Sequence, residues 1–243
     1  MSKNMDVSKR KQSIIAGGLI SSAGIFFAKF IGLFYAVPYN SMLGSADNLA
    51  YYGVAFNIYS YLLNICTAGF PFAIATLIAK YSTRGDYQTS LLIKKLSASL
   101  MTCFGFGMMV IVILFSSPLA ALVMPDEGNS VKTMQMVLIL ISFALFFVPL
   151  LSSIRGFYQG LKHMEVYALS QVLEQVARVA FLLSASAIAV YALHTDQVWA
   201  LYFGVISTSI SAILAIMHLK LYDKKQMREL KRLAKTQEVA GNN

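Results

Sequence analysis

Six long apolar runs dominate this sequence, and each is long enough to cross a lipid bilayer as a helix. A helix needs about 20 apolar residues to span the hydrocarbon core, and the runs cover residues 13–37, 49–79, 96–122, 133–154, 166–194 and 198–219. Only 13% of the 243 residues are charged and 57% are hydrophobic, which is too little charge for the surface of a soluble protein. The sequence therefore predicts an all-α, polytopic membrane bundle of six transmembrane helices over residues 13–219.

The first run has one alternative interpretation, a cleaved signal peptide, because Lys9, Arg10 and Lys11 precede it. The run is longer than the apolar part of a signal peptide, contains Lys29 and lacks a clear cleavage site. We therefore predict a retained helix that follows a short N-terminal tail, residues 1–12.

The charges between the runs predict how the bundle sits in the membrane. Lys and Arg accumulate in cytoplasmic loops, and 17 of the 20 basic residues lie in the two tails, the second-to-third connection and the fourth-to-fifth connection. The other three connections hold only Lys132 among several acidic residues. This alternation predicts a multi-pass protein with both ends in the cytoplasm.

The basic segment 220–243 after the last run has two open interpretations. Its apolar residues Leu221, Met227, Leu230 and Ala234 fit one side of a helix, which would rest on an anionic inner leaflet. The alternative is a solvated basic tail or linker.

A polar stripe interrupts the fifth run. Gln171, Glu174, Gln175 and Arg178 have the spacing i, i+3, i+4 and i+7, which places them on one helical face. Ionisable residues inside a membrane usually face a partner or a wet cavity. Two interpretations stay open: a buried structural ion pair, or cavity-facing groups that meet a polar or anionic substrate.

Polar residues also occur in the first and second runs. Lys29 faces a cavity, extends to the outer headgroups or pairs with a neighbouring side chain. Asn57 and Asn64 share one face of the second run, where hydrogen bonds between helices explain them equally well. Bends in the helices are expected at prolines and glycines inside the apolar runs, namely Pro71, Gly105, Gly107 and Pro149.

The sequence shows no pattern typical of an enzyme or a metalloprotein. It has no nucleophile beside a base, no phosphate-binding glycine loop and no metal-ligand spacing, and Cys66 and Cys103 lie inside apolar runs. Its basic residues form no aromatic-interleaved patch of the kind that binds nucleic acid. We expect no catalysis, no cofactor, no bound metal and no nucleic-acid partner.

The segment RGFYQGLK, residues 155–162, and the polar stripe together carry a family resemblance. They resemble the "RG(Y/F)QG…QxxEQxxR" region of the polysaccharide-transporter branch of the MATE-like (MOP) flippase superfamily, which includes the MurJ-type lipid II flippases and the stage V sporulation protein B group. Segments 28–32 and 64–71 resemble the first and second helices of that family. The motif residues assigned to the fourth-to-fifth cytoplasmic connection are Arg155, Gly156, Gln159 and Gly160.

The resemblance implies an N-terminal six-helix lobe of a two-lobe flippase that alternates access. Such proteins move undecaprenyl-diphosphate-linked saccharides, lipid II-like precursors or polysaccharide repeat units, across the bacterial cytoplasmic membrane. The resemblance implies that cavity cations, here Lys29 and Arg178, meet the diphosphate. The cavity candidates from the polar runs are Glu174, Gln175, Gln171, Asn57 and Asn64.

This chain departs from the family pattern in two ways. Tyr35 stands where lipid II flippases often carry an arginine, which leaves the exact substrate and any coupling ion open. The chain also holds one lobe, so we expect a partner: a missing C-terminal half, a separate chain or a second copy. The alternatives are a cation-coupled drug exporter of the MATE type and a non-catalytic half-transporter or scaffold.

Overall fold

The computed structural model describes residue 19, residues 22–124 and residues 129–241, and the described residues form helices with short connections and no strands. The first helical segment of the continuously described residues spans 22–34. The elements that follow it are α2 (Ala36–Leu43), α3 (Ala46–Thr67), α4 (Phe70–Thr83), α5 (Tyr87–Leu114), α6 (Ser116–Val123), α7 (Asn129–Gly160), α8 (Met164–Ala187), the π-helical turn η1 (Ile188–Ala192) and α9 (Val198–Gly241).

Six stretches of the described residues are long and apolar enough to cross a membrane. They are Ser22–Leu43, Ala46–Thr83, Tyr87–Leu114, Ser130–Gly160, Met164–Ala192 and Val198–Asp223. The predicted all-α bundle of six transmembrane helices is thereby confirmed. The bounds differ from those expected, most of all in the third span, which was expected over 96–122 and is found at Tyr87–Leu114. The N-terminal tail 1–12 lies outside the described residues.

The second span contains a break instead of the expected kink. Its first helix, α3, ends at Thr67, and Gly69 adopts a φ of +74°, a left-handed conformation that glycine tolerates far better than other residues. Pro71 then lies in the first turn of α4, where its missing N–H leaves no helical hydrogen bond unmade.

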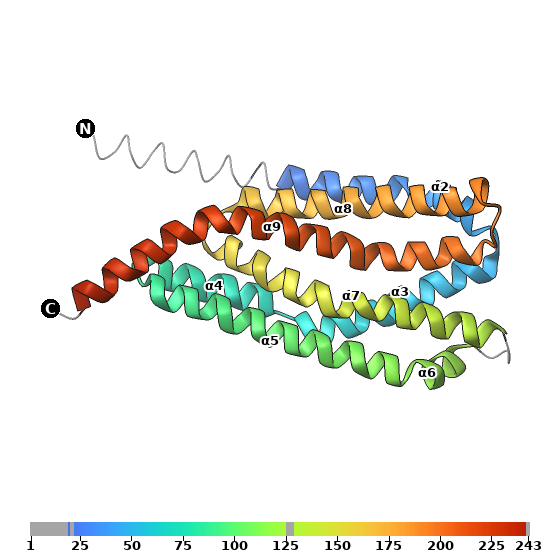
Figure 1. Cartoon of the computed structure of the whole chain (residues 1–243), viewed down its shortest axis with the longest axis horizontal. Coiled ribbons are helices and arrows are strands. Elements are labelled where there is room, and N and C mark those ends of the chain that lie inside the picture. The colour runs from blue at the N-terminus through green and yellow to red at the C-terminus, as the bar shows by residue number, and fades with distance from the viewer. Residues whose placement is uncertain (1–18, 20–21, 125–128, 242–243) are drawn as a thin grey trace.

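The two most buried spans, α7 and α9, form the centre of the bundle. Figure 1 shows α3, α4 and α5 on one side of them, and α8 with segment 22–34 on the other. Buried apolar side chains of α7, including Leu138 and Ile141, pack with Val205 of α9 in one core cluster. Residues Ile78 of α4 and Leu219 of α9 belong to a second cluster.

Glycines let two helix pairs approach closely. A Cβ on Gly32 would lie 2.9 Å from the Gln175 side-chain nitrogen, so segment 22–34 lies directly against α8. A Cβ on Gly156 would lie 2.8 Å from the Pro71 carbonyl oxygen, and one on Gly160 2.6 Å from that of Ala75. These two glycines of α7, four residues apart, bring α4 into contact, as small residues do in membrane helices.

The basic segment after the sixth run continues α9 as one helix to Gly241. Leu230 and Ala234 are buried, and Leu230 belongs to a cluster that includes Leu91 of α5. The Gln88 side chain donates a hydrogen bond to the Ala234 carbonyl at 3.2 Å. Leu230 and Ala234 therefore face protein, because α5 begins early enough to cover them, whereas Leu221 is 66% exposed.

A cluster of polar contacts fixes the start of this extension. Lys94 of α5 forms an ion pair with Asp223 of α9, with a shortest N···O distance of 2.5 Å. The Tyr158 hydroxyl of α7 donates to the same carboxylate at 2.6 Å. Three helices therefore meet at Asp223.

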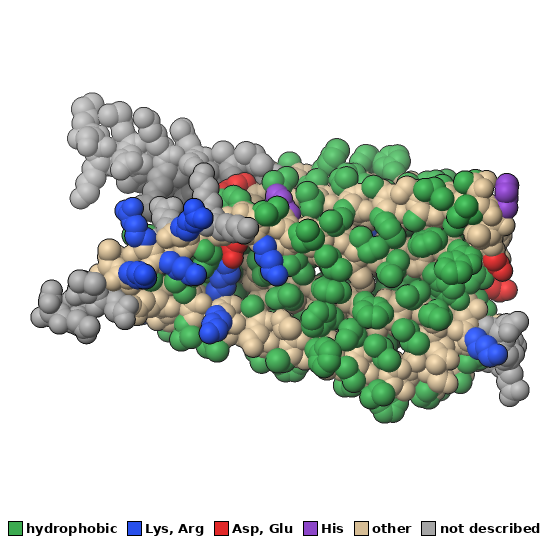
Figure 2. Space-filling model, viewed as in Figure 1, with side chains coloured by type: hydrophobic (Ala, Val, Ile, Leu, Met, Phe, Trp, Pro, Cys, Tyr) green, Lys and Arg blue, Asp and Glu red, His purple; other side chains and the backbone are tan. Residues whose placement is uncertain are grey.

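The two ends of the bundle differ in charge. The α4–α5 and α7–α8 connections lie at the same end as the α9 extension, and the α2–α3 and α8–α9 connections lie at the opposite end (Figure 1). On the face shown in Figure 2, most Lys and Arg side chains gather around the α9 extension, hydrophobic side chains cover the middle of the bundle, and acidic, histidine and further basic side chains lie at the opposite end. The cytoplasmic assignment of this end stays a prediction from loop charge.

Candidate functional site

The motif expected in the fourth-to-fifth connection lies on a helix instead. The last turns of α7 include Arg155, Gly156, Gln159 and Gly160, and only residues 161–163 connect α7 to α8. The prediction of a loop at these positions was wrong, because Gly156 and Gly160 pack on α4 and extend the buried part of α7. Arg155 is consequently a side chain of the bundle.

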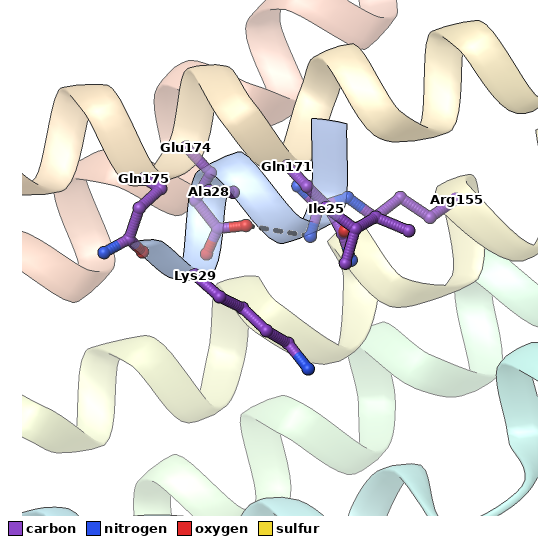
Figure 3. Close-up of a pocket in the computed structure, with 7 residues that line it drawn as sticks. All are labelled: Ile25, Ala28, Lys29, Arg155, Gln171, Glu174 and Gln175. Atoms are coloured by element: carbon purple, nitrogen blue, oxygen red, sulfur yellow. Dashed lines mark ion pairs between the residues drawn. The ribbon is translucent and has the colours of Figure 1, made fainter. Parts of the chain in front are cut away.

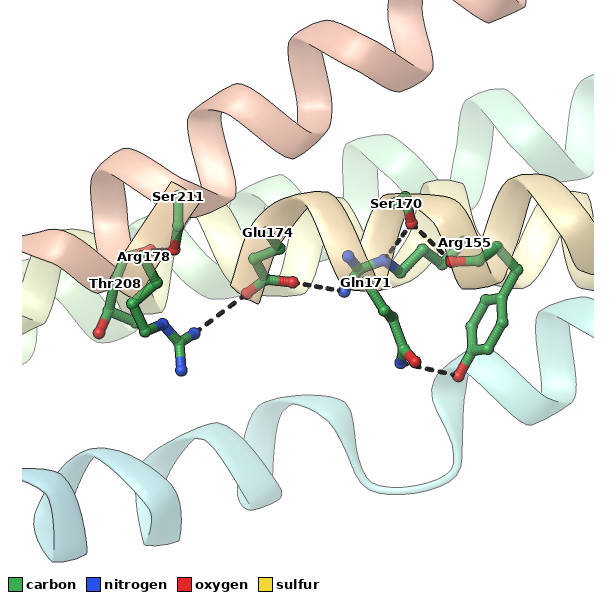
Figure 4. Close-up of polar contacts among 8 residues, drawn as sticks. Arg155, Ser170, Gln171, Glu174, Arg178, Thr208 and Ser211 are labelled. Carbon is green, nitrogen blue, oxygen red and sulfur yellow. Dashed lines mark hydrogen bonds and ion pairs between the residues drawn. The ribbon is translucent and has the colours of Figure 1, made fainter. Parts of the chain in front are cut away.

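Glu174 lies between two arginines. Its Oε2 is 2.8 Å from Nη1 of Arg155 on α7, and its Oε1 is 3.1 Å from Nη2 of Arg178, one turn along α8. Figure 4 shows the three side chains in a row. The side chains of Arg155 and Glu174 are 12% and 13% exposed, so these charges interact in surroundings far less polar than water.

Neighbouring polar groups hold Arg155 in place. Its Nε donates to the Ser170 hydroxyl at 2.8 Å, and that hydroxyl donates to the Tyr167 carbonyl at 2.8 Å. The Gln171 amide donates to the Tyr167 hydroxyl at 3.1 Å. The chain of contacts in Figure 4 therefore continues from Glu174 to the N-terminal turns of α8.

The cluster has more donors than acceptors. Within the described part of the chain, Nη2 of Arg155 and Nε of Arg178 are buried and have no hydrogen-bond partner. Leaving a buried charged donor unpaired is costly. With two guanidinium groups and one carboxylate, this row carries an excess positive charge and spare N–H groups, which suits an added anion.

A pocket of about 210 Å³ opens beside the row. Its lining residues are Ile25, Ala28, Lys29, Arg155, Gln171, Glu174 and Gln175. Figure 3 shows the Lys29 side chain extending away from Glu174. At about 30 Å³ per water molecule, this volume holds several water molecules or a small polar group.

A second pocket of about 210 Å³ shares Arg155 and Gln171 with the first. Its other lining residues are Leu63, Thr67, Pro71, Val148, Ser152, Gln159 and Tyr167. The polar side chains that line the two pockets thus extend from α8 to the break between α3 and α4.

Of the remaining predicted site residues, some line a pocket and others do not. Gln159 lines the second pocket, whereas Gly156 and Gly160 contact α4. Asn57 and Asn64 are exposed on α3 and line neither of these two pockets.

The row lies deep in its span. At a rise of 1.5 Å per residue, Glu174 is about 15 Å and Arg178 about 21 Å from the start of α8 at Met164. The span covers 29 residues, so Arg178 lies near its middle, where a charge is costly unless it has partners or a wet cavity.

Sequence reasoning missed the contact between Arg155 and Glu174. The sequence held one signal for this contact. In a tight helical hairpin that turns at Lys162, residues at similar distances from the turn lie side by side, as Arg155 and Ser170 do.

Within the described residues, no group of three or more His, Cys, Asp or Glu side chains is placed to hold a metal ion.

Comparison with known sequences gives one family match and several relatives. The sequence pattern of the family described as "Polysaccharide biosynthesis protein" matches residues 14–240. The chain is 31% identical over 222 residues to the lipid II flippase MurJ of Bacillus subtilis (strain 168). That alignment covers 89% of this chain and 40% of the relative, so the chain spans less than half of that protein's length.

Solved structures with the same fold include MATE and MurJ proteins. A MATE structure in complex with MaL6 has a TM-score of 0.68 at 14% identity, and covers 89% of this chain and 46% of that protein. The lipid II flippase MurJ in its inward closed conformation has a TM-score of 0.61 at 14% identity, with coverages of 86% and 43%. At these identities the likeness shows the fold alone.

Proposed function

Because the chain belongs to the polysaccharide biosynthesis protein family, we propose that it forms one lobe of a flippase for undecaprenyl-diphosphate-linked saccharides. The membership confirms the resemblance seen in segment 155–162 and the polar stripe. The transported lipid would be a lipid II-like peptidoglycan precursor or a polysaccharide repeat unit, moved across the bacterial cytoplasmic membrane without catalysis.

The observation that carries this proposal is the positively charged row beside the first pocket. Arg155 and Arg178 share one carboxylate and keep buried N–H groups without partners. Guanidinium groups bind phosphate oxygens with paired, charge-assisted hydrogen bonds. Two unit charges 4 Å apart interact by about 4 kcal/mol at an effective dielectric constant of 20, against about 1 kcal/mol in water. A diphosphate would therefore interact most strongly with these arginines where water is scarce.

Other pocket residues have supporting roles in this proposal. Lys29 would approach the diphosphate from the side opposite α8, and the amides of Gln171 and Gln175 would bind neutral oxygen atoms. Asn57 and Asn64, exposed on α3, would meet the saccharide or the second lobe.

A second lobe would complete the cavity. The chain covers less than half of the relative from Bacillus subtilis, and the first pocket lies between segment 22–34, α7 and α8 rather than at the centre of a closed chamber. We propose that the other wall comes from a further six-helix lobe, in the same polypeptide, in a partner chain or in a second copy. Both ends of the bundle's chain would lie in the cytoplasm.

The alternative of a cation-coupled drug exporter needs carboxylates free to bind cations. Among the described residues that line the pocket, Glu174 is the one carboxylate, and both of its oxygens bind arginines. A drug-accumulation assay separates the two functions: a drug exporter lowers intracellular drug, whereas the proposed flippase leaves it unchanged.

Binding of undecaprenyl diphosphate to the purified protein in nanodiscs tests the proposal. We expect Arg178→Gln to weaken binding at least about tenfold, equivalent to about 1.4 kcal/mol. Arg84→Gln, at the exposed end of α4, is the matched control and should bind like the wild type. Equal binding by all three proteins would refute the proposed site.

Two further experiments test the function and exclude a purely structural ion pair. In cells that lack other lipid II flippases, depletion of the full-length protein should reduce lipid II at the outer leaflet, and unchanged accessibility would refute the flippase. If Glu174 and Arg178 only stabilise packing, replacing both with leucine should preserve binding; we expect binding to be lost.

A further inference from the structure

Glu174 uses both of its carboxylate oxygens inside the bundle. One oxygen accepts from Arg155 of α7 and the other from Arg178 of α8. The carboxylate thereby joins two helices and compensates two cations at once. The described residues that line the pocket include no second acidic side chain, so Glu174 alone balances this positive charge.

The two arginines offer more donors than this carboxylate can accept. Nη2 of Arg155 and Nε of Arg178 stay buried and without partners among the described residues. Each carboxylate oxygen already binds one guanidinium. Each phosphate of a diphosphate that links a lipid to a saccharide presents two free, strongly accepting oxygens and one charge, so the diphosphate offers this donor set more acceptors than a carboxylate does.

We propose that Glu174 is an exchangeable counter-ion that occupies the phosphate position between Arg155 and Arg178 when the pocket is empty. Arriving phosphate displaces the carboxylate from one or both guanidinium groups, and the carboxylate returns when phosphate leaves. This inference rests on the proposed function, and it assigns Glu174 the role of a positioning residue that sets how tightly the anion is held.

The exchange has a physical purpose in transport. A site that carries ligands across a membrane must bind them strongly enough to load and weakly enough to release them. Two uncompensated arginines in weakly polar surroundings would hold a diphosphate too tightly. A carboxylate that competes for the same N–H groups lowers the affinity without removing the cations.

Removing the charge of Glu174 is the direct test. Glu174→Gln should bind inorganic pyrophosphate about tenfold or more tightly than the wild type, because the anion no longer competes with a fixed carboxylate. It should also release undecaprenyl diphosphate more slowly. Glu165→Gln is the matched control on the first turn of α8, since the Glu165 side chain is 57% exposed, and it should leave both quantities unchanged.

A measurement on the unaltered side chain covers the case in which Glu174→Gln fails to fold. In protein labelled with ¹³C-glutamate, pyrophosphate should shift one carboxylate stretching band in the infrared spectrum, as Glu174 loses arginine partners. The band should also shift in Glu165→Gln. An unshifted spectrum at saturating pyrophosphate would overturn the exchange.

The outcomes separate this inference from the proposed function. If the wild type binds pyrophosphate and undecaprenyl diphosphate, and Arg178→Gln weakens both, the proposed site stands. Unchanged or weaker pyrophosphate binding by folded Glu174→Gln would then overturn the exchange alone. If the wild type binds neither ligand, both proposals fail.

Discussion

Gly105 and Gly107 of α5 give a sharp test of how closely the helices of this bundle pack. A Cβ on Gly105 would lie 2.6 Å from the Leu145 carbonyl oxygen and 3.2 Å from Cα of Phe146, both in the backbone of α7. A Cβ on Gly107 would meet no described residue of another helix within 4 Å. The same substitution, two residues apart on one helix, therefore has opposite consequences.

The expected magnitudes follow from two opposing effects. Alanine in place of glycine inside a helix stabilises it by about 0.5–1 kcal/mol, and we expect this full gain for Gly107→Ala. Overpacking of a close contact costs about 1–3 kcal/mol, and at Gly105 the obstacle is backbone, which cannot rotate aside. The difference between the two variants isolates the packing cost, about 1–3 kcal/mol, because the helix preference cancels.

Unfolding of the two variants in mixed detergent micelles measures this difference. The free energy of unfolding should rise for Gly107→Ala and fall for Gly105→Ala. Equal changes in both variants would refute the close contact between α5 and α7.

The other predictions concern the α9 extension and the orientation. Asp223→Asn removes the charge that Lys94 and Tyr158 bind. Because hydrogen bonds to charged groups contribute about 1.5–3 kcal/mol to stability, trypsin should cleave the α9 extension of this variant faster than that of the wild type. An unchanged rate of cleavage would contradict the contact. Cysteines placed at Arg84 and Asp196, in a background without native cysteines, should react with an impermeant thiol reagent from the cytoplasmic and the outer side respectively. The reverse pattern would contradict the predicted orientation.

The number of membrane spans was predictable because each span has its own apolar run. Burial in lipid leaves a composition signal that needs no tertiary contact. The helix ends were harder to predict. The polar residues of 155–160 read as a loop, yet they continue α7 because α4 packs on Gly156 and Gly160, a contact with residues about 85 positions away in the chain.

The candidate site was partly predictable for the same reason. The stripe from Gln171 to Arg178 follows from helical spacing alone, and the structure places Lys29 beside it. Arg155 joined the site only in the structure, because its position depends on the α7–α8 hairpin. Likewise, the sequence could not distinguish Gly105, where an added Cβ would meet the backbone of α7, from Gly107, where it would meet no described residue of another helix within 4 Å.

The central claim is that the pocket between segment 22–34, α7 and α8 receives the diphosphate of a lipid-linked saccharide. A photo-crosslinking amino acid with a small diazirine side chain at Ile25, which lines the pocket, tests this claim most directly. The same residue at Leu33, which is 69% exposed on the same segment, is the control. Our account predicts that undecaprenyl diphosphate is captured at Ile25 and that excess pyrophosphate prevents the capture, with neither effect at Leu33. Equal capture at both positions, insensitive to pyrophosphate, would contradict it.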